Sequence, residues 1–138
     1  QEGYQGLARF PEVQQVLPDL LEFCPPHIGA IRDLHDQMID CYRTGDRLQY
    51  YKLNQAIHSG IVALADNAAL ADVHSMLQTR LKRIRFIGHE GPEKWASAVA
   101  EHEEMITALE ARDLDRLSAV LGHHLTMAWE RVKDSLPA

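Results

Sequence analysis

The sequence predicts an all-α fold in a single domain that spans residues 1–138. Apolar residues recur at helical spacing along the chain, and no segment alternates between apolar and polar residues as a strand does. A chain of 138 residues that is 46% hydrophobic can also bury one substantial core. Because the connections between the predicted helices are short, we expect neighbouring helices to pack antiparallel.

Turn and cap residues divide the chain into six predicted helices. Proline, glycine, asparagine and aspartate mark the breaks, since these residues favour turns and helix ends. Asp46 and Asp113 stand where helix N-caps belong, and Pro92 suits an entry turn. The predicted helices span residues 11–23, 27–43, 47–65, 68–87, 93–111 and 114–135.

The composition argues against several classes of function. The formal net charge is −6 and no block of lysine and arginine occurs, which disfavours direct contact with nucleic acid. No apolar run approaches the ~20 residues of a membrane span, and the N-terminal residues do not resemble a signal peptide. Cys24 and Cys41 form neither a CxxC pattern nor a disulfide framework, so we expect a reduced, cytoplasmic setting. The chain lacks an initiator methionine, and we expect it to be part of a longer protein.

Three histidines fall on the interior faces of three predicted helices. His58 lies in 47–65, His102 in 93–111 and His124 in 114–135, and Asn54 precedes His58 by one helical turn. The apolar stripes that define these faces are Leu53, Ile57, Ile61 and Leu64, then Trp95, Val99, Ile106 and Leu109, then Leu117, Leu121, Ala128 and Val132. A buried polar group without a partner costs on the order of 1–3 kcal/mol, and imidazole is a common ligand of transition metals. The pattern indicates a shared metal ion, although each ring could instead hydrogen-bond locally in the core.

The other five histidines are expected to be ordinary. We expect His27, His35 and His89 to lie at the surface or in turns. His74 could touch an apolar face, but it begins a different stripe. His123 is about 100° around the helix from His124, which favours a surface position or one behind the ligands.

Three segments together resemble the FCD domain, the C-terminal effector domain of FadR-type regulators in the GntR superfamily of bacterial repressors. They are YYKLNQAIH at residues 50–58, EHEEMITALEARD at residues 101–113, and the pair HL at residues 124–125. The likeness covers roughly residues 27–135 and keeps its landmarks in order on three predicted helices. The resemblance implies an antiparallel bundle of six or seven helices with a central cavity.

The resemblance also implies a metal site and an effector. In many FCD domains an aspartate and three histidines bind a divalent metal, commonly zinc, nickel or manganese, and a small carboxylate completes its coordination. His58, His102 and His124 match the histidine ligands, whereas Asn54 stands where the family usually has aspartate. A neutral amide oxygen is a weaker ligand for a dication, and it leaves the site one charge more positive.

The family likeness suggests partners beyond the metal. A carboxylate effector would pair with a cation, and Arg9 and Arg83 are the nearest matches in this sequence. These regulators bind DNA through an N-terminal winged helix-turn-helix. Nothing basic or of that type precedes residue 10, so DNA would be reached only through a domain missing from this chain. The resemblance further implies a homodimer.

Two other readings remain open from the sequence. A zinc hydrolase would also use three protein ligands and an open position, but no buried acidic residue is expected as its general base. Glu101 and Glu103 flank His102 and point about 100° away from it. A helical domain without metal is the second alternative. For a regulator, we expect helix 11–23 to pass the signal on, with hinges at Pro11 and residues 24–26.

Overall fold

The computed structural model describes residues 27–87 and 90–136. The predicted helix 11–23, the expected hinges at Pro11 and residues 24–26, and Arg9 therefore lie outside the described residues. Within these two ranges the chain is helical and contains no strand, which confirms the all-α prediction. The chain divides into two compact units, residues 1–80 and 81–138, and each is described by itself. The helix number of the whole chain and the central cavity stay predictions.

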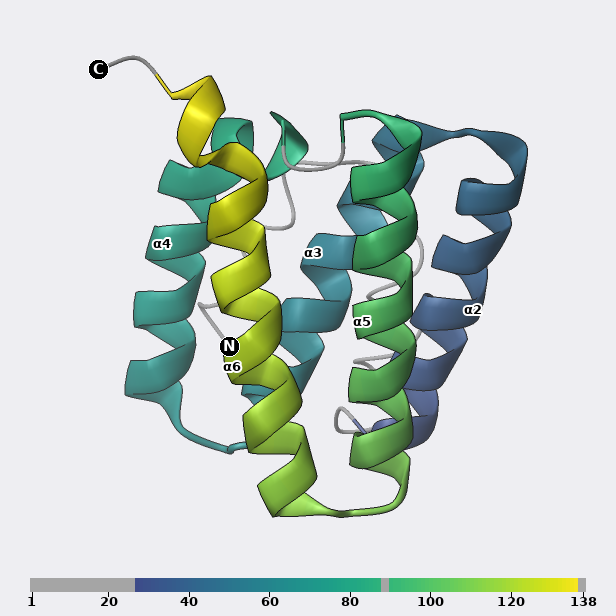
Figure 1. Cartoon of the computed structure of the whole chain (residues 1–138). Helices are drawn as coiled ribbons and strands as arrows, with labels where there is room; N and C mark the ends of the chain where they lie inside the picture. The colour runs from purple at the N-terminus through teal and green to yellow at the C-terminus, as the bar shows by residue number, and fades with distance from the viewer. Residues whose placement is uncertain (1–26, 88–89, 137–138) are drawn as a thin grey trace. The chain divides into compact units, whose positions relative to one another are not determined.

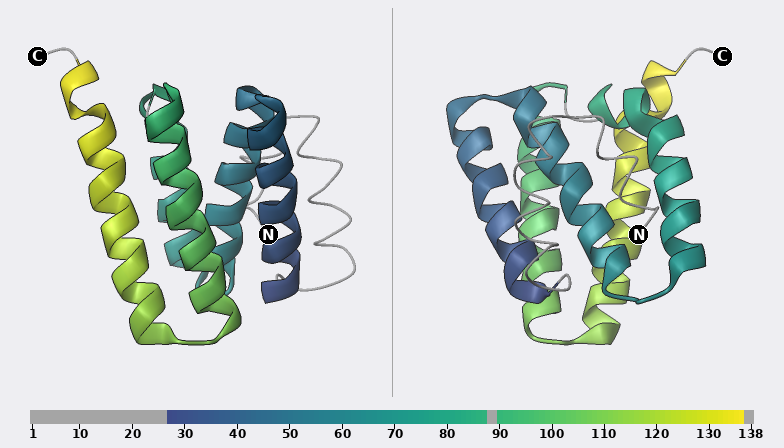
Figure 2. Two further views of the ribbon diagram at one scale, coloured as in Figure 1. Left: turned by 45° about the vertical axis from the view of Figure 1, so that its right-hand side comes forward. Right: turned by 180° about the vertical axis from the view of Figure 1, so that it is seen from behind.

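The first unit is built on the pair α2 (Ile28–Thr44) and α3 (Arg47–Ala63), which lie side by side and antiparallel (Figures 1 and 2). Gly45 makes the turn between them possible, because its φ of 77° is in the left-handed region that favours glycine. Asp46 then caps α3 by accepting a hydrogen bond of 3.1 Å from the Gln49 backbone. The fully or almost fully buried core residues of the pair include Ile31, Leu34, Met38, Tyr50, Leu53 and Ile57.

His35 corrects one prediction, because its side chain is completely buried in α2 instead of lying at the surface. The buried face of α2 is broad enough that two consecutive residues, Leu34 and His35, both lie on it. His35 follows Ile31 by four positions, so it belongs to a helical stripe that the sequence pattern already contained. The remaining expectations hold where the structure describes them, since His27 caps α2 at its exposed start and His123 is exposed on the last long helix.

Helix α4 (Ala68–Ile87) begins after a turn in which Asp66 has a φ of 48°. Asn67 caps it by accepting a hydrogen bond of 3.1 Å from the Leu70 backbone. The part of α4 in the first unit is joined to α3 by Gln78, whose side chain is buried and donates to the Ser59 hydroxyl at 2.9 Å. His74 contacts the same amide at 3.2 Å. The Gln78 side chain therefore joins α3 and this part of α4 through polar contacts.

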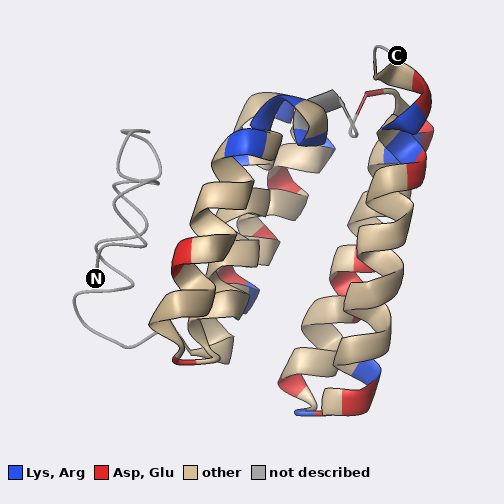
Figure 3. Ribbon diagram, turned by 90° about the vertical axis from the view of Figure 1, so that its left-hand side faces the viewer, with Lys and Arg blue, Asp and Glu red and all other residues tan. Residues whose placement is uncertain are grey.

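Besides the end of α4, the second unit contains a hairpin of α5 (Pro92–Glu110) and α6 (Leu114–Val132), followed by the short helix η3 (Lys133–Ser135). Pro92 occupies the first turn of α5, and Asp113 caps α6 by accepting from the Arg116 backbone at 3.1 Å, both as predicted. Ala98, Met105 and Ile106 are completely buried. Lysines and arginines of the hairpin lie near its two ends (Figure 3), and one of them, Arg131, belongs to the buried polar network described below.

For the helices after residue 26, the predicted limits agree with the observed ones to within a few residues. The largest difference is at the C-terminus, where the α-helix ends at Val132 and η3 replaces its predicted last turn. Among residues 27–87 and 90–136, no helix combines the length and the apolar character needed to cross a bilayer.

Candidate metal centre

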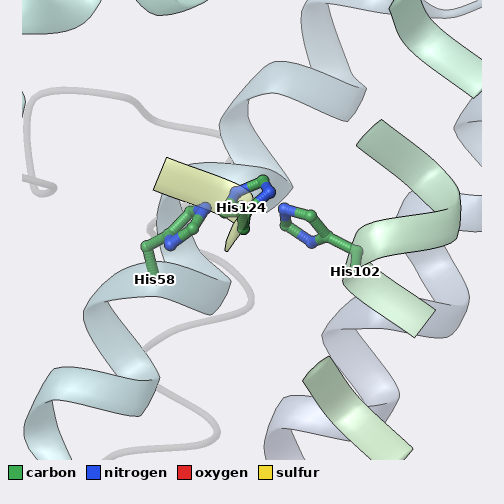
Figure 4. Close-up of side chains that lie close together, drawn as sticks. All are labelled: His58, His102 and His124. Atoms are coloured by element: carbon green, nitrogen blue, oxygen red, sulfur yellow. The ribbon is translucent and has the colours of Figure 1, made fainter. Parts of the chain in front are cut away.

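His102 of α5 and His124 of α6 face one another in the middle of the hairpin. Their ring centroids are 4.9 Å apart and their planes meet at 81°, an edge-to-face arrangement (Figure 4). His102 is completely buried and His124 is 5% exposed. The second unit therefore brings together two of the three histidines that the sequence selected, one from each helix.

Glu101 is a buried carboxylate in contact with His124. Its Oε2 lies 2.6 Å from His124 Nδ1, and the residue is only 8% exposed. From the sequence, no buried acidic residue is expected as a general base; Glu101 is buried, but it is hydrogen-bonded to His124. The buried face of α5 is wider than the predicted stripe and includes Ala98, Met105 and Ala108, so it reaches around the helix to Glu101. Glu103 is exposed, as expected.

A buried arginine compensates the charge of Glu101. Arg131 of α6 is 8% exposed and donates from its guanidinium to Glu101 Oε1. The Ser97 hydroxyl donates to the same oxygen at 3.2 Å and accepts a longer hydrogen bond of 3.4 Å from Arg131. Lys94 closes the arrangement by donating to the Arg131 carbonyl oxygen at 2.6 Å. Glu101 thus has a separate partner on each oxygen, the cation on one and the imidazole on the other.

These contacts determine the charge of Glu101. Burial by itself raises the pKa of this carboxyl group, but hydrogen bonds and charges from His124 and Arg131 act in the opposite direction, and the pKa is lowered on balance. An ionised carboxylate can only accept hydrogen bonds, so His124 Nδ1 must be the donor. In a neutral ring the proton is then on Nδ1, and Nε2 carries a lone pair. That is the form of histidine that binds a metal through Nε2.

The first unit carries the other two predicted ligands one turn apart on α3. Asn54 is 3% exposed and His58 is 8% exposed. The buried Oδ1 of Asn54 has no hydrogen-bond partner among the residues that the structure describes. An unsatisfied buried amide oxygen is costly, and a divalent cation would satisfy it. The donor types in the predicted set, three imidazoles and one amide oxygen, therefore fit a metal ion.

Among the residues that the structure describes, neither of the two predicted effector arginines is found buried at the histidines. Arg83 is exposed on α4, and Arg9 lies outside the described residues. Arg131, which the sequence analysis did not select, is buried and hydrogen-bonds Glu101, the carboxylate in contact with His124. Its signal was present, because Arg131 follows His124 by seven residues and so lies on the same face of α6, two turns further on.

Comparison with known families identifies the family to which the chain belongs. The family model of the FCD domain matches residues 24–127, well over half of the chain. The chain belongs to the FCD domain family, whose members are the regulatory, effector-binding domains of GntR-family regulators. No curated protein and no solved structure matches the chain.

Proposed function

We propose that this domain binds one divalent metal ion through His58, His102 and His124, with Asn54 as a fourth, weaker donor. The observation that carries the proposal is the edge-to-face pair of His102 and His124, buried in the middle of a hairpin beside an ionised carboxylate. His58 is a third buried histidine that offers a ring nitrogen. The unsatisfied Oδ1 of Asn54, one turn before His58, gives independent support.

Zinc is the metal that this set of donors favours. Imidazole nitrogen is a preferred zinc ligand, and nickel and manganese are alternatives that the same family uses. When bound, the ion would supply a positive charge and a coordination position for an anionic ligand. The residues of the chain would orient the rings. Glu101 holds the His124 ring in place through Nδ1, and burial between the helices restricts the orientation of the His102 ring. Water is excluded from the pair because both rings are buried.

The proposed effector is a small organic acid that modulates DNA binding by the parent regulator. A carboxylate suits a cationic site better than a neutral ligand does. Arg9 and Arg83 remain the proposed cationic partners of the acid. DNA would be contacted by an N-terminal winged helix-turn-helix in a cytoplasmic homodimer. The effector would act by preferring one arrangement of the helices, with a coupling of typically ~1–3 kcal/mol.

Metal analysis of the purified chain tests the first part. After saturation with zinc and removal of excess metal, we expect close to one ion per chain in the wild type and far less in His102→Ala. His123→Ala is the matched control, because His123 is the exposed neighbour of His124 and should leave the stoichiometry unchanged. A wild-type chain that retains no stoichiometric zinc, nickel or manganese would contradict the proposed site.

A ligand screen tests the second part. In the zinc-loaded domain, hydroxy acids, sugar acids or dicarboxylates should raise the melting temperature by binding the folded state. Arg83→Ala and Arg9→Ala should weaken that effect while the bound metal remains. If only neutral compounds or long-chain acyl ligands stabilise the domain, the effector is not a small acid.

A further inference from the structure

The two oxygens of Glu101 have partners of different kinds. Oε1 accepts from Arg131 and Ser97, whereas Oε2 faces His124 Nδ1 at 2.6 Å. A guanidinium group can only donate hydrogen bonds, while a neutral imidazole can donate or accept, depending on which nitrogen carries the proton. Arg131 therefore fixes the orientation of the carboxylate, and the carboxylate in turn determines which nitrogen of the His124 ring carries the proton.

We infer that Arg131 and Glu101 are positioning residues that set the tautomer of His124, with the proton on Nδ1 and the lone pair on Nε2. The inference deepens the proposed function, on which its consequence for metal binding rests. It needs no contact beyond the α5–α6 hairpin, because all four residues of the network, Ser97, Glu101, His124 and Arg131, belong to that hairpin. Neither Arg131 nor Glu101 is assigned as a ligand.

The geometry makes a sharp prediction for Glu101→Gln, which keeps the shape of the side chain but makes its two ends different. The remaining oxygen stays with Arg131, because the guanidinium can only donate. The amide nitrogen then takes the place of Oε2 and faces His124 Nδ1. Since that nitrogen is only a donor, Nδ1 must accept, and the ring proton moves to Nε2. The nitrogen proposed to bind the metal is then blocked.

The double variant Glu101→Gln/Arg131→Met distinguishes control of the His124 tautomer by Arg131 and Glu101 from a merely structural role of these residues. Without the guanidinium, the glutamine amide is free to rotate and to present its oxygen to His124. We expect the proton to return to Nδ1 and part of the metal affinity to recover. A structural role would predict the opposite, because the double variant loses one more buried partner than the single variant. Glu103→Gln is the matched control, the same chemical change two residues along α5 at an exposed position.

The tautomer is measured by long-range ¹H–¹⁵N NMR on the metal-free, histidine-labelled 138-residue chain, at a pH of about 8, where imidazole is ordinarily neutral. We expect the Nδ1–H form in the wild type and in Glu103→Gln, and the Nε2–H form in Glu101→Gln. Zinc affinity, from chelator competition, should fall roughly 10- to 100-fold in Glu101→Gln and be unchanged in Glu103→Gln. An Nε2–H ring in the wild type overturns the inference without any variant.

The other outcomes are equally decisive. If the His124 ring still carries its proton on Nδ1 in Glu101→Gln, Arg131 does not fix the orientation of residue 101. If the double variant binds zinc more weakly than Glu101→Gln and retains the Nε2–H form, the network is structural only. A wild-type chain that binds no metal but shows the predicted tautomers refutes the proposed function and leaves the inference intact. The two failures are therefore distinguishable.

Discussion

Replacing Asn54 by aspartate tests the proposed metal centre from the side of α3. Asn54 is 3% exposed, and its Oδ1 has no hydrogen-bond partner among the described residues. A carboxylate at this position would give a divalent ion a charged oxygen donor in place of a neutral one. A charge-assisted contact is worth about 1–3 kcal/mol, and each 1.4 kcal/mol is tenfold in affinity. The dissociation constant for zinc should therefore fall roughly five- to 150-fold in Asn54→Asp.

The same substitution should weaken the metal-free domain. A buried carboxylate without a cation loses its hydration, which raises its pKa and costs free energy. We expect the free energy of unfolding of metal-free Asn54→Asp to fall by about 1–3 kcal/mol. Saturating zinc should reverse the loss, because the ion compensates the new charge. Opposite effects on the two states are the signature of a residue that faces the metal.

Calorimetric titration of zinc and denaturant unfolding with and without metal provide the assay. Asn67→Asp is the matched control, because Asn67 is an exposed N-cap of α4 and aspartate is an equally good cap. It should change neither quantity appreciably. If Asn54→Asp leaves zinc affinity unchanged or weaker, the side chain of residue 54 is not directed at a metal, and Asn54 leaves the proposed ligand set.

Two further predictions concern the fold that carries the site, and both are measured by denaturant unfolding. Ile106→Ala should lower the free energy of unfolding by about 2–5 kcal/mol, because Ile106 is completely buried one turn after His102 on α5. Leu125 is 57% exposed, so the control Leu125→Ala should change the free energy of unfolding little. Asp113→Ala removes the cap that accepts from the Arg116 backbone and should cost about 0.5–2 kcal/mol in the same experiment, whereas Asp113→Asn should be almost neutral. Equal stability of the alanine and asparagine variants would show that the cap contributes nothing.

Local chemistry explains why the helices could be predicted so closely. Asp46 and Asp113 cap the helices that follow them, Pro92 starts α5, and Gly45 ends α2. Each of these signals acts within about one turn of the helix end, so the sequence alone contains it. The C-terminal end of α6 has no such residue, and there the predicted α-helix extends beyond the observed one to Ser135.

The buried polar residues were only partly predictable. His102 and His124 could be found because each continues an apolar stripe at helical spacing. Glu101 could not be found in this way, since a carboxylate is buried only when a cation is also brought in, and Arg131 lies 30 residues further along the chain. His35 was misjudged for a simpler reason, because the buried face of α2 is broad enough to include two consecutive residues. Pairing between helices is a tertiary property that periodicity does not report.

The polar network of α5 and α6 has a consequence for the kinetics of metal capture. The contacts that join its two helices link residues 23 to 34 positions apart across one tight connection. Closing so short a segment costs less chain entropy than closing a long one, and proteins rich in such local contacts fold quickly. The ring of His124 is therefore expected to be oriented before an ion arrives. A ligand that is already oriented loses less conformational freedom on association, so capture should depend on the encounter with the ion and not on a slow rearrangement of this hairpin.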